Sequence, residues 1–352
     1  MMLKRFAAIA CATLCAITAA LSIDAAETTD PVAAPVEHRR TPDQTFLTFP
    51  EWYLVHSPAE YAAYLPGTTY PSGFPFFAHI GQFWQGYAAV TKETERYPFN
   101  GGYHLMIMVI GTSTTIEYTL KGLYERTIGR LAEASKTQQQ VPEEAFAARY
   151  AQAYVDFIRV DPWYRFDFWG QLRELWSDVP LSGPDLTRRW ERRYLLTSEL
   201  LIKEGYARLI KLGTQSIYDA PKPVTAVLLS KAPVPDATHD ADYATLGPAR
   251  SDGLVLATIP RYEGFNTYAR WLAAQDIDFS EIAGNTGEIL VSELVPLDHQ
   301  AQGVRILFEQ PILTQQNRKR VVFAVPIAGL SAELRRAQSD AGKTVVEHVY
   351  DF

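Results

Sequence analysis

Cysteine is nearly absent from this chain of 352 residues, and both cysteines, Cys11 and Cys15, lie in an apolar run near the N-terminus. A chain cut after Ala26 would contain no cysteine. That composition excludes disulfides, thiol catalysis and cysteine-ligated metal chemistry together.

Recognisable catalytic and cofactor motifs are absent as well. The sequence has no Gly-x-Ser-x-Gly motif, no P-loop, no dinucleotide-binding fingerprint and no Cys-x-x-Cys-His haem attachment site. Its histidines show neither the His-x-x-x-His nor the Glu-x-x-His spacing of helical metal sites. We therefore expect no metal and no cofactor.

Positive charge is also scarce. Without Lys4, Arg5 and Asp24 the chain keeps 31 of its 33 basic and 39 of its 40 acidic residues, a formal charge of −8. Nucleic-acid binding needs a positively charged surface, so we expect no nucleic-acid partner.

The N-terminus has the pattern of an export signal. Lys4 and Arg5 precede an uncharged run of 18 residues over 6–23, and small residues follow it. A basic segment before an apolar run directs secretion, and this run is close to the minimum length for crossing a bilayer. We expect residues 1–26 to be a cleaved signal peptide or a retained anchor. The protein would then be extracytoplasmic (periplasmic), either soluble or tethered to the inner membrane.

The remaining chain divides by composition. Residues 27–44 are polar, contain proline and show no periodicity, which predicts a flexible tether. Residues 45–218 hold 32 of the 43 aromatic residues and predict a helical domain. Residues 219–250 are rich in proline and predict a linker, with one possible strand at its start. Strand and helix patterns alternate over 251–352.

The predicted fold class is therefore α+β, with an N-terminal aromatic-rich all-helical domain followed by a C-terminal ferredoxin-like split βαβ module. Residues 103–131 predict one long helix whose first turns are apolar on all sides, so we expect it to be buried on every side. Ser57, Pro58 and Glu60 match the preferred residues of a helix start. No internal repeat is evident in the sequence.

Three segments carry a resemblance. They are Thr45–Tyr53 (TFLTFPEWY), Gly101–Met106 (GGYHLM) and Val346–Phe352 (VEHVYDF). With them the chain resembles an uncharacterised group of bacterial exported proteins that bear an N-terminal signal or anchor. The resemblance implies the localisation given above. It implies no activity, cofactor or catalytic residue.

Four residues are candidates for catalysis. They are His79, His104, Glu117 and Glu199. The two glutamates lie in the middle of long predicted helices among apolar neighbours, where burial would raise the pKa of a carboxylate and let it serve as an acid or base. His79 lies off the apolar stripe of its helix and could meet His104 across a helix contact, and the favoured alternative for each histidine is a hydrogen-bonded residue at a helix interface. Each glutamate also has a lysine four residues later, and this spacing favours an ordinary ion pair. Convergence of the four side chains in one cleft would indicate an enzyme, and dispersion would indicate a binding protein.

Arginines form the most distinctive local pattern. Arg188, Arg189, Arg192 and Arg193 make two columns on a predicted helix, with Trp190 between them. One interpretation is contact with anionic lipid headgroups or a partner protein, with Trp190 at the membrane interface. The other is pairing with acidic groups of the same domain.

The aromatic residues also allow two interpretations. Trp84, Tyr87 and Tyr118 are candidates for lining an apolar ligand pocket, because such pockets are mostly apolar and aromatic. Alternatively, they fill a helical core.

Together these patterns favour a non-catalytic, envelope-associated protein that binds an apolar small molecule, a lipid or an envelope protein through its helical domain. One alternative is an extracytoplasmic enzyme that uses His and Glu groups in an aromatic pocket. A further alternative is a structural subunit of a membrane complex. The sequence does not indicate an oligomeric state.

Overall fold

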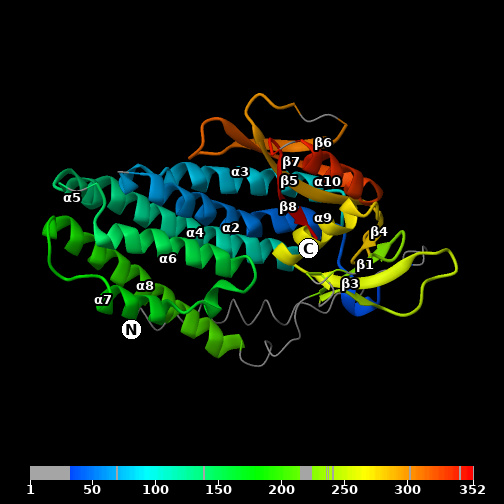
Figure 1. Ribbon diagram of the computed structural model, residues 1–352, viewed down its shortest axis with the longest axis horizontal. Coiled ribbons are helices and arrows are strands. Elements are labelled where there is room, and N and C mark those ends of the chain that lie inside the picture. Colours follow the sequence, from blue (N-terminus) through cyan, green and yellow to red (C-terminus); the bar gives the residue numbers. More distant parts are fainter. Residues whose placement is uncertain are drawn as a thin grey trace. The chain divides into compact units, whose positions relative to one another are not determined.

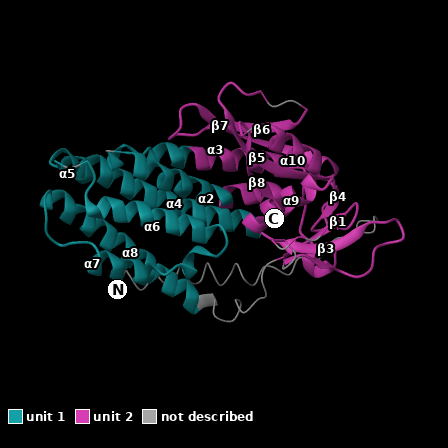
Figure 2. Cartoon of the chain, in the orientation of Figure 1, with its two compact units in different colours: residues 1–25, 52–81, 102–219 teal, residues 26–51, 82–101, 220–352 magenta. Residues whose placement is uncertain are grey.

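The computed structural model divides the chain into two compact units, which Figure 2 draws in different colours. The expected signal peptide or anchor over residues 1–26 lies outside the described residues. The structure describes residues 32–68, 70–137, 139–214, 224–234, 236, 238–239, 242–300, 303–340 and 342–351. Unit 1 takes Trp52–Gly81 and Gly102–Asp219, and unit 2 takes Ala26–Glu51, Gln82–Gly101 and Ala220–Phe352.

Helices form unit 1, as the sequence predicts (Figure 1). Two of them are shared: α2 (Gln44–Gly67) begins in unit 2 and continues in unit 1, whereas α3 (Phe76–Thr94) begins in unit 1 and continues in unit 2. The other elements of this unit are η2 (Pro71–Gly73), α4 (Gly101–Tyr124), the π-helix η3 (Glu125–Gly129), α5 (Arg130–Ala134), α6 (Pro142–Ile158), η4 (Trp163–Arg165), α7 (Phe168–Ser177) and α8 (Leu186–Thr214).

The boundary expected at residue 45 therefore differs from the structural one. The first two turns of α2 belong to unit 2, because the Thr45 hydroxyl donates to the Tyr350 carbonyl (2.7 Å) and accepts from the Leu290 amide (2.9 Å). The helix start expected at Ser57 is also wrong. Helix α2 continues through Pro58, although proline cannot donate the helical hydrogen bond at that position.

The expectation that residues 103–131 form a helix buried on every side is wrong as well. The segment is helical throughout, as α4, η3 and α5. However, α4 buries only one face, which carries His104, Ile107, Gly111, Tyr118 and Gly122. The opposite face is exposed and apolar, and is described below.

The expected tether over residues 27–44 is ordered where the structure describes it. It includes η1 (Val36–His38), and the Ala34 side chain is buried. The backbone amides of Ala33 and Ala34 donate to the buried Glu281 carboxylate at 2.8 and 2.7 Å. These two hydrogen bonds hold the segment against unit 2.

Unit 2 contains two antiparallel sheets of four strands each, with strand orders β2-β3-β1-β4 and β6-β7-β5-β8. The strands are β1 (Val224–Leu229), β2 (Ala244–Thr245), β3 (Val255–Pro260), β4 (Phe279–Ile282), β5 (Glu288–Pro296), β6 (Arg305–Pro311), β7 (Arg318–Pro326) and β8 (Val345–Tyr350). The helical elements are α9 (Glu263–Ala274), η6 (Ile327–Gly329) and α10 (Leu330–Ser339).

The two sheets have the same topology. In each, the first strand lies at the centre, antiparallel to the third and fourth strands, which a helix connects. Unit 2 thus repeats one β-β-β-α-β topology in two halves, and each half contains a split βαβ. The α+β class with a helical N-terminal part is confirmed. The expected single module over residues 251–352 is incomplete, because β1, the central strand of the first sheet, lies within the segment expected to be a linker.

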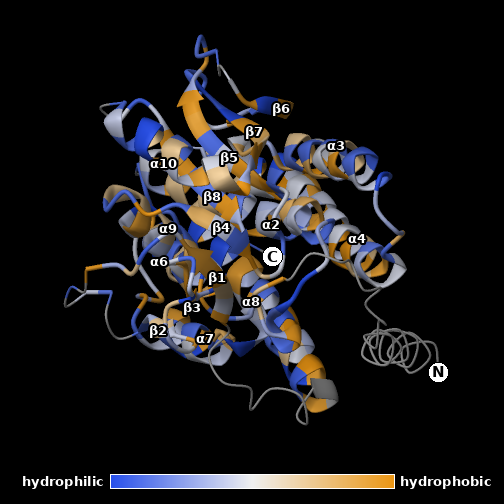
Figure 3. Cartoon of the chain, turned by 90° about the vertical axis from the view of Figure 1, so that its right-hand side faces the viewer, coloured by the Kyte–Doolittle hydropathy of each residue, from blue (hydrophilic) through white to orange (hydrophobic). Residues whose placement is uncertain are grey.

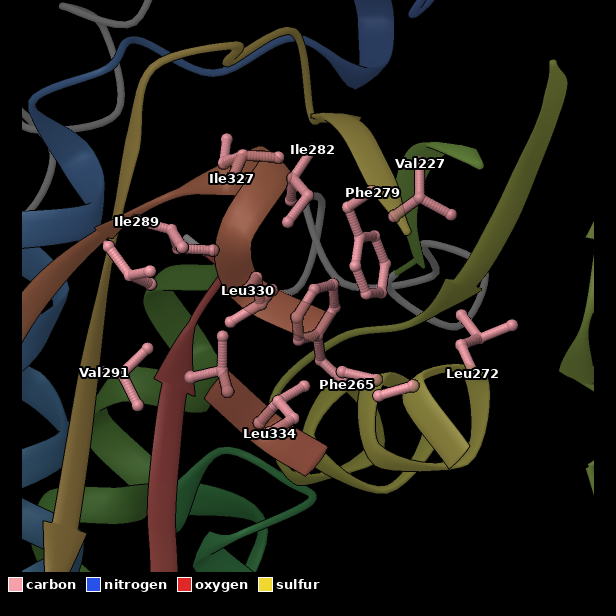
Figure 4. Close-up of a cluster of buried hydrophobic side chains, with 14 of the residues drawn as sticks. Val227, Phe265, Leu272, Phe279, Ile282, Ile289, Val291, Ile327, Leu330 and Leu334 are labelled. Atoms are coloured by element: carbon pink, nitrogen blue, oxygen red, sulfur yellow. The ribbon is translucent and has the colours of Figure 1, made fainter. Parts of the chain in front are cut away.

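Both halves contribute to one hydrophobic core. Alternating apolar residues on the strands face apolar residues spaced by three and four on α9 and α10. Figure 4 shows part of this core, where Phe265 of the first half lies near Leu330 and Leu334 of the second. Neither half buries its apolar face by itself, so we expect the halves to fold together.

Candidate functional site

The four candidate catalytic residues do not share a cleft. Tyr118 lies on the same helix as His104, 14 residues further along, and at 1.5 Å per residue their backbones are about 21 Å apart. His79 lies beside Tyr118, whereas Glu117 and Glu199 form ion pairs with lysines.

A buried polar cluster surrounds His79 in unit 1. The Nδ1 atom of His79 lies 3.0 Å from the Ser57 hydroxyl and 3.1 Å from the Tyr53 hydroxyl, and Ser57 lies 2.9 Å from the Tyr118 hydroxyl. A Glu60 carboxylate oxygen is 3.8 Å from the Nε2 atom of His79. Ser57, His79 and Glu60 are 1, 1 and 8% exposed. The cluster connects α2, α3 and α4.

The two candidate glutamates belong to a charged cluster between α4 and α8. Lys121 pairs with Glu199 (3.0 Å), and Lys203 pairs with both Glu199 (3.0 Å) and Glu117 (3.2 Å). Burial would raise the pKa of Glu199, but the charges of Lys121 and Lys203 outweigh it and hold that pKa well below its usual value. A carboxylate with a lowered pKa stays ionised, so the ion-pair interpretation applies to Glu199. Glu117 is also ion-paired, but with Lys203 of α8 and not with Lys121 four residues later.

The candidate pocket aromatics are also dispersed. Trp84 and Tyr87 belong to unit 2, with ring centroids 6.0 Å apart, and Tyr118 belongs to unit 1. Tyr118 is 7% exposed and hydrogen-bonds Ser57, as described above. Tyr118 belongs to a hydrophobic core cluster, which agrees with the interpretation that the aromatic residues fill a helical core.

Arg188, Arg189, Arg192 and Arg193 are buried, with exposed fractions of 0, 3, 4 and 1%. The interpretation that they contact lipid headgroups is therefore corrected, because buried side chains cannot reach a membrane surface. They form a network of five cations and five carboxylates, so the buried charge balances. The ion pairs are Lys136–Glu144, Arg188–Glu133, Arg188–Glu144, Arg188–Glu191, Arg189–Glu143, Arg192–Glu125, Arg192–Glu191 and Arg193–Glu143.

The π-helix η3 belongs to this network. Glu125 at its start receives two hydrogen bonds from Arg192 (2.7 and 3.1 Å), and the Gly129 carbonyl at its end accepts one from Arg188 (2.9 Å). A side chain at Gly129 would collide with the Glu125 carboxylate. Glycine at this position therefore lets the Glu125–Arg192 pair lie against the helix backbone.

Ion pairs also fix the arrangement of α4 and α8. Glu117 pairs with Lys203, Lys121 with Glu199, and further along Glu125 with Arg192. From one pair to the next the residue number rises along α4 and η3 and falls along α8. The two helices α4 and α8 therefore lie side by side and run antiparallel.

An exposed apolar surface covers this helix pair, and we call it the α4–α8 face. On α4 the exposed Ile116 immediately precedes Glu117, and the exposed Leu120 immediately precedes Lys121. On α8 the exposed Ile202 immediately precedes Lys203, and all three following residues are ion-paired between the helices. Because the helices are antiparallel, the same offset places Ile116, Leu120 and Ile202 on the same side of the pair. Figure 3 shows the hydropathy of the two helices. The face comprises Leu105, Met108, Ile116, Leu120 and Leu123 of α4 and Trp190, Tyr194, Leu201 and Ile202 of α8, all between 43 and 71% exposed. At about 100° per residue, Tyr194, Leu201 and Trp190 lie about 80, 100 and 120° from Ile202, so they extend the face around α8 away from α4.

Sequence reasoning missed this face. Only Trp190 of its nine residues was singled out. The spacing of Ile116, Leu120 and Leu123 indicates an apolar stripe along the helix. Because the first turns of α4 are apolar on all sides, the sequence did not indicate which side of the helix is exposed to solvent.

Among the described residues, no helix is long and apolar enough to span a membrane. No group of three or more His, Cys, Asp or Glu side chains in that part of the chain could hold a metal ion.

Comparisons with known proteins give no match, whether to a family model, to a curated protein or to a solved structure.

Proposed function

We propose that this protein binds the surface of a lipid bilayer through the α4–α8 face, as a non-catalytic, envelope-associated protein. The observation that supports this function is the apolar face itself. Soluble monomers rarely expose contiguous apolar surface beyond a few hundred Å², and larger patches mark interaction sites. Here nine large side chains stand outside on two adjacent helices.

The chemistry of one end of the face favours a bilayer. Trp190 and Trp176 are 47 and 44% exposed with ring centroids 6.2 Å apart, and Tyr194 is 67% exposed. Tryptophan and tyrosine are enriched at membrane interfaces, because their rings are apolar and their N–H or O–H groups reach water.

Basic side chains lie near the same end. Arg126 and Arg130 are exposed on η3 and α5, beside the part of α8 that carries Trp190. Anionic lipid headgroups complement this positive charge, at about 1 kcal/mol for each basic residue near the surface. A second copy of the chain would present the same positive charge, so self-association is favoured less.

The apolar run over residues 6–23 agrees with this function. If it is retained as an anchor, it holds the chain at the membrane, and the face then makes a second contact. Membrane binding through two weak elements is stable where one alone is reversible.

Vesicle flotation tests the proposal. The chain starting at Glu27 is mixed with vesicles of phosphatidylcholine, with and without phosphatidylglycerol, and circular dichroism checks that each variant is folded. Burying a whole leucine side chain contributes about 1.5–3 kcal/mol, so a half-exposed one adds about 1 kcal/mol. We expect the Leu120→Asp, Ile202→Asp double variant to lose vesicle binding.

The matched control is Val160→Asp, which places the same charge at a 65% exposed apolar residue of unit 1 outside the face. This variant should float with vesicles as the wild type does. Equal retention of the double variant and the wild type would overturn the proposal. So would a concentration-dependent dimer that the double substitution dissociates while the wild type fails to float, because the occupant would then be a second copy.

A further inference from the structure

Helix α7 carries large apolar side chains on its solvent side as well as on its core side. The core side is buried and consists of Phe168, Leu172 and Leu175. Three residues at spacings of four and three lie together on the exposed side, namely Trp169, Arg173 and Trp176. Both tryptophans are 44% exposed. A surface helix usually has polar side chains on its solvent side, so this side of α7 is a candidate contact surface.

Helix α8 carries a matching stripe beside α7. The stripe consists of four exposed residues at spacings of four, four and seven, namely Leu186, Trp190, Tyr194 and Leu201. At about 100° per residue they lie within about 80° of one another. Trp176 joins the two helices, because its ring centroid lies 6.2 Å from that of Trp190 and its Nε1 atom donates to the Thr197 hydroxyl at 3.1 Å. We call these stripes of α7 and α8 together the α7–α8 flank.

The flank lies to the side of the surface proposed to contact the bilayer. Tyr194 and Trp190 are about 80 and 120° around α8 from Ile202. When Ile202 points into the bilayer, these two side chains therefore stand beside the helix, near the level of its axis. An amphipathic helix inserts its apolar side by about 5–10 Å, and a helix with its side chains has a radius of about 5–6 Å. The flank is thus expected at the level of the lipid headgroups.

The side chains of the flank suit the chemistry of that level. Tryptophan and tyrosine concentrate there because an apolar ring meets the acyl chains while an N–H or O–H group meets polar groups. The indole N–H groups of Trp169 and Trp190 donate to no residue that the structure describes. Arg173 likewise makes no ion pair within the described part of the chain. Its guanidinium can donate two parallel hydrogen bonds to one phosphate group.

We infer that the α7–α8 flank binds anionic phospholipid at the level of the phosphate group, with Arg173 on the phosphate and Trp169 and Trp176 on either side of it along the helix. The inference rests on the proposed function, because the flank reaches this level only when α8 lies on a bilayer. It adds to that function a second contact and a side chain that selects anionic lipid. The negative charge of the headgroup complements the guanidinium, and the Trp176–Trp190 contact makes the flank continuous with the α4–α8 face.

Vesicle binding isotherms of the chain starting at Glu27 test the inference. On vesicles that contain phosphatidylglycerol, Arg173→Gln should weaken binding about fivefold, which is the contribution of one basic residue near an anionic surface. On pure phosphatidylcholine it should bind as the wild type does, because the choline group already neutralises the phosphate. Trp169→Ala should weaken binding to both kinds of vesicle, because an interfacial ring contributes whatever the headgroup charge.

The matched control is Arg159→Gln, which removes a 41% exposed cation at the end of α6. It should bind both kinds of vesicle as the wild type does, and circular dichroism shows whether each variant is folded. Failure of the wild type to bind any vesicle would refute the proposed function and this inference with it. If the wild type binds and Arg173→Gln binds phosphatidylglycerol vesicles equally tightly, only the inference is overturned.

Two other outcomes would overturn the inference as well. Equal weakening by Arg159→Gln would show that the loss comes from net charge and not from the flank. A dimer that Trp169→Ala dissociates, with vesicle binding unchanged, would show that a second copy of the chain occupies the flank. Size-exclusion chromatography of the wild type and of Trp169→Ala detects such a dimer.

Discussion

Neutralising Glu143 should destabilise unit 1 strongly. This carboxylate is 1% exposed and accepts hydrogen bonds from two buried arginines, Arg189 at 3.1 Å and Arg193 at 2.7 Å. The substitution Glu143→Gln keeps the shape of the side chain and removes its charge. Both guanidinium groups would then keep only neutral partners, the backbone carbonyls near Pro180.

The size of the effect follows from the burial of the pair. Removing one partner of a buried ion pair costs about 3–5 kcal/mol, because the remaining charge is desolvated without compensation. For a unit of this size each kcal/mol lowers the melting temperature by about 2–4 °C. We therefore expect a decrease on the order of 6–20 °C, measured by circular dichroism at neutral pH.

The control is Glu309→Gln, which removes a 39% exposed carboxylate that pairs with Lys319 at 2.9 Å. An exposed pair contributes about 0–1 kcal/mol, so this variant should melt nearly as the wild type does. If Glu143→Gln also melted within about 2 °C of the wild type, the balanced-charge account of the arginine network would be refuted.

Two further predictions concern stability. Gly129→Ala should destabilise unit 1, because the new methyl group collides with the ion-paired carboxylate beside it, whereas Gly205→Ala, on α8 with open space around it, should stabilise by about 0.5–1 kcal/mol; urea unfolding of both variants measures the difference. Burial raises the pKa of both Glu293 and Asp351 to about 7, so the folded state binds more protons than the unfolded state between the usual carboxyl range and pH 7. The melting temperature should therefore fall as pH rises from about 5.5 to 8, and Asp351→Asn should reduce that slope; an unchanged slope would contradict the assignment.

Periodicity and turn residues predicted much of the local structure. The arginine columns were placed on a predicted helix, and α8 contains all four arginines. The alternation of strand and helix patterns expected over residues 251–352 is observed from β3 to β8, because these strands are flanked by turns and most of them are buried.

Pairing between distant segments was not predictable in the same way. Strand β1 follows a proline-rich segment, and its central position depends on partners about 30 and 50 residues further along the chain. The topology shared by the two sheets was not predicted either, because it lies in the order in which distant strands pair and not in a repeated residue pattern. The arginine columns left two interpretations open, and only the positions of Glu125, Glu133 and Glu143 distinguish between them.

Unit 2 is built from segments that are far apart in the sequence, and this affects the order in which the protein folds. Its core includes Thr45 near one end of the described chain and β8 at the other, and Thr45 bonds Tyr350 across 305 residues. Contacts of such high sequence separation form slowly. Unit 2 therefore cannot complete its second sheet until the chain has been synthesised as far as Tyr350, and the contact of α2 with β8 has to wait until then.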